Sequence, residues 1–535
     1  MLTALMVLII VFSNAAGDVF LTRGMKQVGD LSAFGRLELL RAIKRIAGNL
    51  NFILGVLCLA VSFFSFLAVL SWANLSFVVP ATAIVYAVTV LGAKFILREQ
   101  IDGMRWAGTL LVCLGVALVC LPEDRPLSLS MLLEPVRTFL GILTAASACY
   151  YLVSIVAAEK FFAAPPLRDA AAGLPSPSTR SCKLAAGRGE FCLRPVSILV
   201  PLYGADFRAY QNYASLCRQD YPEFEIVFGV GSSLDSSLPV VARLRADFPR
   251  VPIQLVVSAG EIGPNPKVNT LNNMLPRAGH EILLMLDSDI RVGPDFIRTI
   301  ASELPPDAEG LVTCLYRAGE APGTPSKLEA AGISTEFAPG VLVAHMAGGI
   351  SFAFGAAIAT SKKTLETIGG LKAIAFYLAD DYMMGNLVRK AGLPVKLSRY
   401  VVETVLARLS LSEFVRHQTR WARGIRACAP WGHAGSIIMN GTVLSFLYFA
   451  LSGFSGFGLF IFASVVALRL GMAWMVGVRR LGDKILRRSL ALVPLRDFFS
   501  LFIWSAAFFG KRVVWRDRVF RLEKDGKFTP EEISR

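Results

Sequence analysis

The segment Glu281-Ile282-Leu283-Leu284-Met285-Leu286-Asp287-Ser288-Asp289 runs five apolar residues directly into two carboxylates that lie one residue apart. A short apolar run without alternation predicts a strand that is buried on both faces of a parallel sheet. Carboxylates just past its last residue would lie at the carboxyl edge, where open α/β sheets bind ligands. Asp287 and Asp289 can share a hard divalent cation through oxygen, and a solvated Asp-Ser-Asp turn is the alternative.

The segments around this strand alternate between two patterns. Further apolar runs that predict buried strands lie at 196–201, 223–230 and 253–257, with helical segments between them at 210–218 and 238–247. Alternation of strand and helix predicts an α/β domain with a doubly wound, Rossmann-like and largely parallel sheet.

The composition indicates a membrane protein. The 535 residues are 54% hydrophobic, and the mean hydropathy of +0.54 is too high for a soluble enzyme. The net charge of +15 lies largely beside apolar spans, where Lys and Arg set topology and face anionic lipid. Because no basic tract is interleaved with aromatic residues, nucleic acid is not an expected partner.

Apolar segments before about residue 160 and after about residue 436 predict membrane spans on both sides of a globular middle. The candidate spans are 2–20, 50–72, 76–97, 104–121, 136–158 and two within 437–478. Basic residues flank 489–510 on both sides, which predicts a re-entrant or interfacial segment. The Lys/Arg bias of the connections places the amino terminus outside and the middle domain in the cytoplasm.

Cysteine and histidine patterns exclude two kinds of site. The nine cysteines form no C-x-x-C pair, and the four histidines show no i,i+4 pairing. We therefore expect neither a zinc site nor a disulfide framework.

These patterns divide the chain into five parts. They are a four-span unit at 1–122, an extra span at 123–163, a Pro-, Ala-, Gly- and Ser-rich linker at 164–194, a soluble domain at 195–435, and C-terminal transmembrane or re-entrant segments with a basic tail at 436–535. The first part resembles the drug/metabolite transporter superfamily of the EamA and small-multidrug-resistance type, through Asn74-Leu75-Ser76-Phe77-Val78-Val79-Pro80 and Phe95-Ile96-Leu97-Arg98-Glu99-Gln100. The resemblance implies a flippase-like module, and a plain membrane anchor is the alternative.

The middle domain carries a series of short motifs. They are Val196-Ser197-Ile198-Leu199-Val200-Pro201-Leu202, Gln219-Asp220-Tyr221-Pro222, Gly263-Pro264-Asn265-Pro266-Lys267-Val268-Asn269, Asp287-Ser288-Asp289-Ile290-Arg291-Val292, Gly369-Gly370-Leu371 before Ala379-Asp380-Asp381-Tyr382, and His417-Gln418-Thr419-Arg420-Trp421. In this order they resemble the inverting family 2-21 glycosyltransferases with the GT-A fold. The ceramide glucosyltransferase branch, with its bacterial relatives tied to hopanoid biosynthesis, is the nearest match.

The resemblance assigns the donor side of the site to residues near the strand ends. Asp287 and Asp289 would hold Mg²⁺ or Mn²⁺, which neutralises the diphosphate of a UDP-sugar as the glycosidic bond breaks. Lys267 would reach the phosphate or the uridine as a point charge, with a solvated surface lysine as the alternative. Asn265 and Pro201 belong to the same donor-binding motifs.

The acceptor side is assigned to two later motifs. Asp381 would act as the general base that takes the proton of the acceptor hydroxyl. Asp380 belongs to the same catalytic pair. An N-cap for a helix that begins near Tyr382 is the alternative, and it suits Asp380 better than Asp381. Arg420 offers a planar fork for phosphate and Trp421 a flat wall at the acceptor mouth, and a membrane-interface anchor is the alternative for Trp421.

Three positions depart from the family pattern. Ser232 stands where the family has the aspartate that contacts the nucleotide base, and Asp235 follows three residues later. His417 replaces the Gln or Arg that opens the Arg-Trp motif. The His-Pro of ceramide glucosyltransferases is absent from 334–339, which favours another lipid alcohol such as a hopanoid polyol.

The sequence thus predicts a metal-dependent, inverting glycosyltransferase that is embedded in a membrane, with its catalytic domain in the cytoplasm. We expect this membrane to be the inner membrane of a bacterium. It would move a hexose or N-acetylhexosamine from a UDP-sugar to a hydroxyl of a ceramide or hopanoid-type lipid. One alternative is a lipid flippase or small-molecule transporter with a regulatory or degenerate glycosyltransferase domain, which Ser232 favours. Another is a processive polysaccharide synthase.

Overall fold

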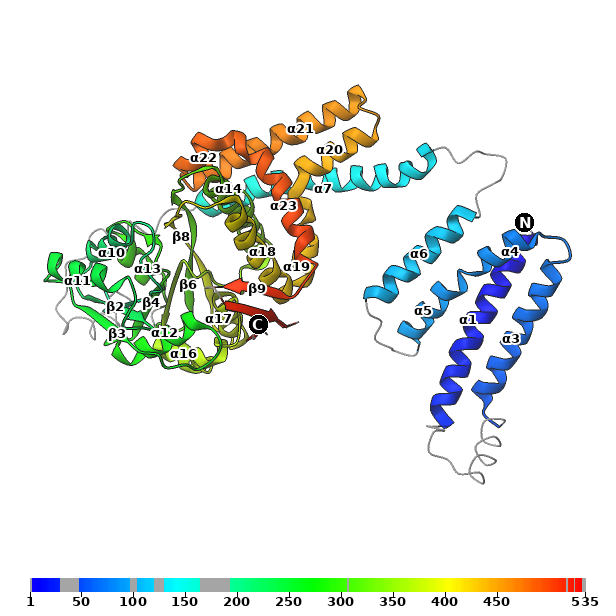
Figure 1. The fold of residues 1–535 in the computed structure, drawn as a ribbon, viewed down its shortest axis with the longest axis horizontal. Helices are drawn as coiled ribbons and strands as arrows, with labels where there is room; N and C mark the ends of the chain where they lie inside the picture. Colours follow the sequence, from blue (N-terminus) through cyan, green and yellow to red (C-terminus); the bar gives the residue numbers. More distant parts are fainter. Residues whose placement is uncertain are drawn as a thin grey trace. The chain divides into compact units, whose positions relative to one another are not determined.

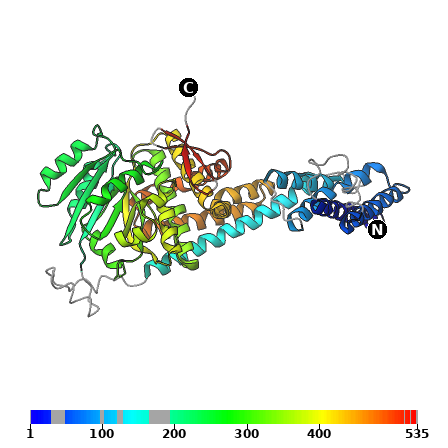
Figure 2. The ribbon, with the colours of Figure 1, turned by 90° about the horizontal axis from the view of Figure 1, so that it is seen from below.

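The computed structural model describes residues 2–28, 48–96, 103–119, 129–163, 193–305, 307–515, 518–523 and 525–531 (Figures 1 and 2). The chain forms two compact units, Met1–Leu132 and Leu133–Arg535. The predicted linker at 164–194 lies, apart from its last two residues, outside the described residues. The five domain boundaries stay predictions.

The first unit is built from helices. They are α1 (Leu2–Val28), α3 (Leu50–Val69), α4 (Leu75–Thr82), α5 (Val85–Phe95) and α6 (Gly103–Val119). α1 and α3 pack closely because glycines leave room between them. A Cβ on Gly17 would lie 2.8 Å from Leu59 Cδ2, and one on Gly55 would lie 2.9 Å from the Leu21 nitrogen. Small residues at helix contacts are typical of membrane bundles.

Seven helical segments among the described residues are long and apolar enough to cross a membrane. They are Leu5–Gln27, Leu50–Val69, Phe77–Lys94, Leu133–Ala163, Pro430–Leu451, Gly456–Arg480 and Lys484–Ala507. Six of them overlap predicted spans. The remaining predicted span, 104–121, corresponds to the 17-residue helix α6. The segment predicted as re-entrant or interfacial overlaps Lys484–Ala507, whose length and composition also suit a crossing.

An eight-stranded sheet forms the centre of the second unit, in the order β3-β2-β1-β4-β7-β6-β8-β5 (Figure 1). Its strands are β1 (Val196–Pro201), β2 (Phe224–Val230), β3 (Ile253–Val257), β4 (Ile282–Leu286), β5 (Ile290–Arg291), β6 (Leu311–Glu320), β7 (Ala357–Ser361) and β8 (Val395–Val405). β3, β2, β1 and β4 are parallel, and so are β6 and β8, whereas β7 runs antiparallel to β4 and β6, and β5 to β8. The predicted α/β class is confirmed. The sheet is mixed beyond β4, because β7 returns in the opposite direction.

The apolar run at 282–286 lacks alternation because both faces of the sheet are covered. Leu284 packs with α10 (Ala209–Cys217) and α13 (Phe296–Glu303) in one core cluster. Leu283 packs on the other face with α12 (Pro266–Met274) and α17 (Asp380–Lys390). Burying one such leucine contributes about 1.5–3 kcal/mol, so this strand is held firmly from both sides. Asp287 follows it directly.

The remaining helices of this unit cover the sheet or belong to the apolar segments. They are α7 (Leu129–Ala163), α11 (Leu238–Asp247), η2 (Leu275–Arg277), α14 (Thr324–Gly332), η3 (Ile333–Phe337), α15 (Ala338–Gly348), α16 (Lys362–Thr367), η4 (Leu371–Ile374), α18 (Leu411–Cys428), α19 (Pro430–Gly435), η5 (Ser436–Asn440), α20 (Gly441–Leu451), α21 (Gly456–Met472), η6 (Ala473–Arg480), α22 (Lys484–Ser489), η7 (Leu490–Leu492) and α23 (Val493–Ala507). A three-stranded sheet follows, formed by β9 (Arg512–Trp515), β10 (Arg518–Leu522) and β11 (Phe528–Pro530).

A buried polar cluster joins η3 to the apolar helices. Arg469 Nη2 of α21 donates to Asp497 Oδ1 of α23 at 2.8 Å, and both side chains are almost fully buried. Arg469 also donates to the Thr335 carbonyl at 3.1 Å. Beside this pair, Arg496 Nε donates to Glu336 Oε1 at 2.8 Å. Removing one partner of a buried pair costs about 3–5 kcal/mol, so the cluster fixes η3 against α21 and α23.

Candidate active site

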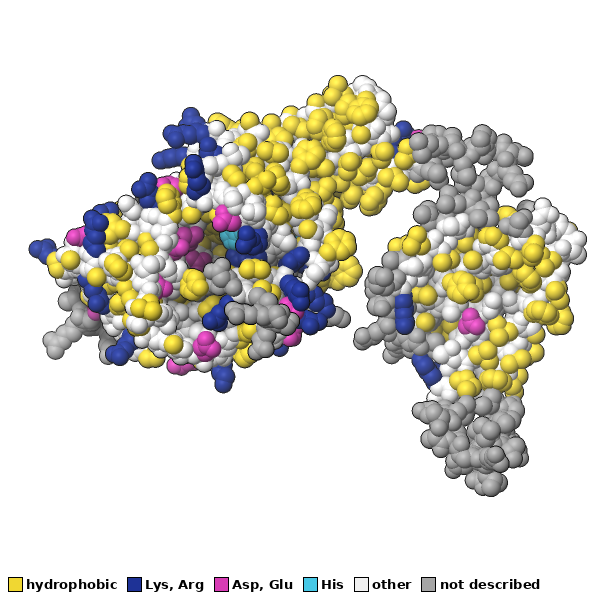
Figure 3. All heavy atoms as spheres, in the orientation of Figure 1, with side chains coloured by type: hydrophobic (Ala, Val, Ile, Leu, Met, Phe, Trp, Pro, Cys, Tyr) yellow, Lys and Arg dark blue, Asp and Glu magenta, His cyan; other side chains and the backbone are white. Residues whose placement is uncertain are grey.

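The first group of predicted residues meets at the carboxyl edge of the sheet. Asp287 and Asp289 follow β4, as the apolar run predicted, and Pro201 ends the neighbouring strand β1. The Asp287 side chain is 38% exposed, so it is open to a ligand. Figure 3 shows a hollow on this unit in which Asp and Glu side chains lie beside Lys, Arg and a histidine.

Lys267 lies at the start of α12 and is positioned by Asn265. Asn265 Oδ1 caps the helix by accepting hydrogen bonds from the Lys267 and Val268 nitrogens at 3.0 and 3.1 Å. Its Nδ2 donates to the Tyr377 carbonyl at 2.9 Å and to Asp380 Oδ1 at 3.4 Å. Asn265 is fully buried, so this geometry suits a residue that positions Lys267 and α17 rather than one that contacts a nucleotide.

The Lys267 ammonium lies among three carboxylates. Its Nζ is 2.5 Å from Asp287 Oδ1 and 3.9 Å from Asp380 Oδ2. Burial opposes the charged form, but Asp287, Asp380 and Asp381 together outweigh it and raise the pKa of Lys267. Lys267 is therefore a permanent positive charge at the end of β4, and the alternative of a solvated surface lysine does not describe its surroundings.

The Asp380-Asp381 pair begins α17, two residues before the predicted start. The N-cap residue is Ala379 and both aspartates lie inside the helix, so the alternative of an N-cap describes neither of them. Asp381 Oδ2 accepts a hydrogen bond from the Gly355 nitrogen at 2.7 Å, and Oδ1 accepts one from the Tyr382 nitrogen at 2.7 Å. Burial and the neighbouring Asp380 raise the pKa of Asp381 to about 6. A carboxylate tuned toward neutral pH suits general base work.

Gly355 is a site residue that the sequence patterns did not single out. It lies in the loop before β7, and a Cβ built on it would lie 2.8 Å from Lys267 Nζ, 2.9 Å from Asp287 Oδ2 and 3.3 Å from Asp381 Oδ2. The three groups therefore converge on one point of backbone that only glycine leaves open. A glycine near a strand often marks a place where another group approaches the backbone closely, and this is the sequence signal that could have indicated Gly355.

Asp289 is positioned by a hydrogen bond from strand β8. Its Oδ2 accepts a hydrogen bond from Thr404 Oγ1 of β8 at 2.7 Å, and burial with the nearby Asp287 raises the pKa of Asp289 to about 7. Ser288 Oγ donates to Asp206 Oδ2, so Asp206 is a further acidic neighbour that the motifs did not indicate.

Two carboxylates on this edge fit a divalent cation that is shared with a substrate. Among the described residues, no group of three or more His, Cys, Asp or Glu side chains is arranged to hold a metal alone. Mg²⁺ is commonly held by one or two carboxylates together with substrate phosphates. Asp287 and Asp289 match that kind of donor set.

Ser232 and Asp235, where the sequence departs from the family pattern, both accept hydrogen bonds within loops. Ser232 Oγ accepts from the Leu234 nitrogen at 3.1 Å. The Asp235 carboxylate accepts from the Gly204 nitrogen at 3.0 Å and from Ser237 Oγ at 2.6 Å. Asp235 thus ties the loop after β1 to the loop after β2, and its predicted role in donor binding stays a prediction.

The Arg-Trp motif lies on α18, whose start is fixed by a Ser410–Glu413 capping box. The His417 and Trp421 rings pack at 4.5 Å on one face of the helix. His417 Nδ1 lies 3.0 Å from Glu329 Oε1, and Glu329 is almost fully buried. The Arg420 guanidinium lies 5.8 Å from the Trp515 ring. His417 thus contacts α14 and Trp421, and Arg420 contacts β9.

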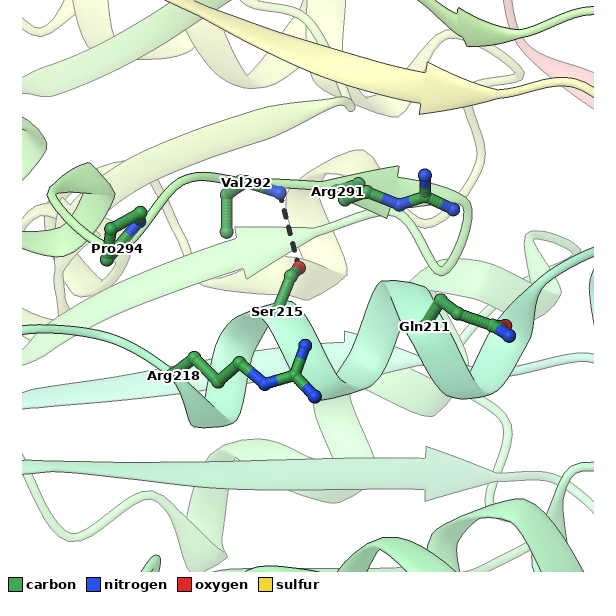
Figure 4. A pocket seen from close by; sticks show the side chains of 6 residues that line it. All are labelled: Gln211, Ser215, Arg218, Arg291, Val292 and Pro294. Carbon is green, nitrogen blue, oxygen red and sulfur yellow. Dashed lines mark hydrogen bonds between the residues drawn. The ribbon is translucent and has the colours of Figure 1, made fainter.

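A cavity of about 490 Å³ on the domain contains none of the predicted site residues (Figure 4). It lies between α10 and the segment after β5, and Ser215 Oγ accepts from the Val292 nitrogen across it at 3.2 Å. Arg291 in its wall is paired with Glu320 at 3.1 Å. The cavity is separate from the converging acidic groups.

Comparison with known proteins gives consistent matches. The family model described as glycosyl transferase family 21 matches residues 142–528. Ceramide glucosyltransferase 1 of Caenorhabditis elegans is 25% identical over 343 residues, which cover 62% of this chain and 72% of that protein. Ceramide glucosyltransferase of Candida albicans is 30% identical over 115 residues, or 19% of this chain and 21% of that protein.

Among solved structures, one match is the mannosyltransferase PcManGT from Pyrobaculum calidifontis in complex with GDP-Man and Mn²⁺. The match covers 70% of this chain and 97% of that chain, with 18% sequence identity and a TM-score of 0.41. The α/β domain with its mixed sheet is of the GT-A class that the sequence predicted. Since the family model matches well over half of its length, the chain belongs to glycosyl transferase family 21 and is a glycosyltransferase.

Proposed function

We propose that this glycosyltransferase moves a hexose or N-acetylhexosamine from a UDP-sugar to a hydroxyl of a membrane lipid, by direct displacement with inversion. The convergence of Lys267, Asp287 and Asp381 on Gly355 carries the proposal. It puts a permanent cation, a carboxylate open to a ligand and a tuned base within a few ångströms of one point. Direct displacement requires those three functions in one place.

Each side chain has a defined task in this mechanism. Asp381, held by the Gly355 and Tyr382 nitrogens, accepts the proton of the acceptor hydroxyl as its oxygen attacks the anomeric carbon. Lys267 faces the charge that develops on the departing diphosphate. Asp287 and Asp289 would hold Mg²⁺ or Mn²⁺, which would supply further positive charge there. Asp380, 3.9 Å from the Lys267 ammonium, helps to keep it charged.

The lipid acceptor is supported by the architecture and by the relatives. Seven apolar helical segments would hold the domain against a bilayer, in our proposal with the site on the cytoplasmic side of a bacterial inner membrane. The relatives are named ceramide glucosyltransferases. The segment 334–339 lacks their His-Pro and instead lies at η3, where Glu336 pairs with Arg496. A hopanoid polyol is therefore proposed beside ceramide as the acceptor.

The N-terminal unit is proposed to be accessory to transfer. We propose that residues 1–122 form a flippase-like EamA-type module or an anchor, and both leave the chemistry to the second unit. Deleting them should spare transfer in detergent. Loss of transfer in a deletion protein that still unfolds cooperatively on heating would refute this.

One assay tests the main proposal. The purified full chain is incubated with Mg²⁺ or Mn²⁺, a panel of labelled UDP-sugars, and ceramide or a hopanoid polyol. We expect a lipid that carries a single sugar, and no such product from Asp381→Asn. A polymer would indicate a processive synthase. Equal lack of transfer by wild type and variant, with lipid flipping in vesicles, would favour the transporter alternative.

A further inference from the structure

A basic pocket lies at the C-terminal end of the chain, outside the candidate active site. It has a volume of about 530 Å³ and is lined by Arg423 of α18, Gly510, Lys511, Arg512 of β9, Arg521 of β10 and Glu531. Four basic side chains thus face one carboxylate. Figure 3 shows Lys and Arg side chains gathered over this region, where Figure 1 places β9.

The pocket is built by specific hydrogen bonds. Arg423 donates through Nη1 to the Arg512 carbonyl at 2.6 Å and through Nη2 to the Phe509 carbonyl at 2.9 Å. Arg512 Nε pairs with Glu531 Oε2 at 2.8 Å. These contacts fix α18, the end of α23 and the small sheet relative to one another. The pocket is therefore a defined feature and not a loose group of surface charges.

The positive charge in the pocket is incompletely balanced. Glu531 is engaged by Arg512, and Lys511 makes no side-chain hydrogen bond or ion pair with any residue that the structure describes. Arg423 Nε is buried without a hydrogen-bond partner. Burial and, to a smaller extent, the neighbouring Arg426 lower the pKa of Arg423, and an anion bound nearby would favour its charged form.

Exposed aromatic residues border the pocket. Phe509 is 74% exposed and immediately precedes the lining residues, and Trp431 of α19 is 88% exposed. Phe508 packs against Trp504 and His433 at 4.8 and 4.9 Å, so α19 lies beside the end of α23. The apolar segment Lys484–Ala507 ends just before Phe508. Aromatic rings beside basic side chains at the end of an apolar helix are typical of the headgroup level of a bilayer.

We propose that this pocket binds the phosphate headgroup of an anionic phospholipid of the bilayer that surrounds the protein. In this proposal the headgroup phosphate lies between Lys511 and Arg521. The acyl chains of the lipid lie along the exposed aromatic residues that border the pocket. Charge complementarity selects the headgroup and the apolar border selects a lipid over a free anion. None of the lining residues is a proposed donor or acceptor residue, so the proposal does not rest on the proposed function.

The test measures lipid binding to the full chain in detergent. Native mass spectrometry follows the retention of phosphatidylglycerol and of phosphatidylcholine as each is titrated. Each basic side chain close to an anionic lipid strengthens binding about fivefold, so Lys511→Gln with Arg521→Gln should weaken phosphatidylglycerol binding roughly 25-fold. Phosphatidylcholine binding should be weak and unchanged. Both residues are exposed, so the thermal unfolding midpoint should stay within a few degrees.

Matched variants separate this site from general surface charge. Arg250→Gln with Arg277→Gln removes the same charge at two exposed positions of the α/β domain and should leave lipid binding within twofold. Lys511→Arg with Arg521→Lys should retain it. Equal binding of phosphatidylglycerol by wild type and the Gln variant, or an equal loss in the control, would overturn the proposal. Displacement of the lipid by millimolar inorganic phosphate would also overturn it, because it would reveal a small-anion site.

Discussion

Replacing Gly355 by alanine tests whether the converging groups react together. The added methyl would lie 2.8 Å from Lys267 Nζ and 2.9 Å from Asp287 Oδ2, whereas ordinary contacts to a Cβ begin at 3.4 Å. Both groups must therefore retreat by about half an ångström. The φ angle of Gly355 is not positive, so alanine adds no backbone strain and the effect is local.

The expected loss follows from that displacement. A misplacement of 1 Å costs about 10²-fold in rate, so half of it costs roughly tenfold. Weakening of the 2.7 Å bond from the Gly355 nitrogen to Asp381 removes up to another tenfold. We expect kcat to fall roughly 10- to 100-fold. Because that bond lowers the pKa of Asp381, the acid limb of the rate profile should move to higher pH.

The assay is the initial rate of lipid glycosylation by the purified full chain between pH 5 and 8. Gly348→Ala is the matched control, because a Cβ on Gly348 at the end of α15 meets nothing within 4 Å. It should behave as wild type, and both variants should unfold within a few degrees of it. A Gly355→Ala enzyme with wild-type kcat and an unmoved acid limb would refute the assignment of the reacting groups.

Three other substitutions probe separate parts of the structure. Asp381→Asn should lower kcat by about 10²–10⁴-fold and abolish the acid limb of the rate profile. The reason is that the wild-type rate rises as Asp381 ionises near its pKa of about 6. An acid limb that persists in the variant would argue for another base. Asp235→Ala should destabilise the fold by about 1–3 kcal/mol through its lost bonds to the neighbouring loop, with little change in the KM for UDP-sugar; a large rise in KM without loss of stability would make Asp235 a donor ligand. Arg496→Met should destabilise by about 3 kcal/mol, as read from thermal unfolding in detergent, because the largely buried Glu336 loses its ion-pair partner and keeps only the bond from Ser500 Oγ. Adding Glu336→Gln should restore much of the loss, and its failure to do so would contradict the pairing.

The sequence predicted the features that depend on short stretches of chain. The run before Asp287 indicated a strand covered on both faces, and the structure confirms it with core clusters on each side. Asn265 and Lys267 came from the Gly263-to-Asn269 motif that carries the family resemblance, and the structure places them at the start of α12. In each case the pattern that made the prediction lies within a few residues of the chain.

Features that depend on distant contacts could not be predicted. The role of Gly355 appears only when the loop before β7 folds against α12 and α17. The nearer of these helices in the sequence, α17, begins 25 residues later, at Asp380. The antiparallel direction of β7 likewise depends on long-range packing. The bond from the Gly204 nitrogen to Asp235, which crosses 31 residues, was likewise not visible in the sequence, and a role for Asp235 in donor binding stays a prediction.

The most direct test of the central claim is the anomeric configuration of the product. The full chain is supplied with the α-linked UDP-sugar it accepts and with ceramide or a hopanoid polyol, and the purified glycolipid is analysed by proton NMR. Direct displacement assisted by Asp381 predicts one β-linked sugar per lipid. An α-linked product, or a β-linked product made equally well by Asp381→Asn, would contradict it.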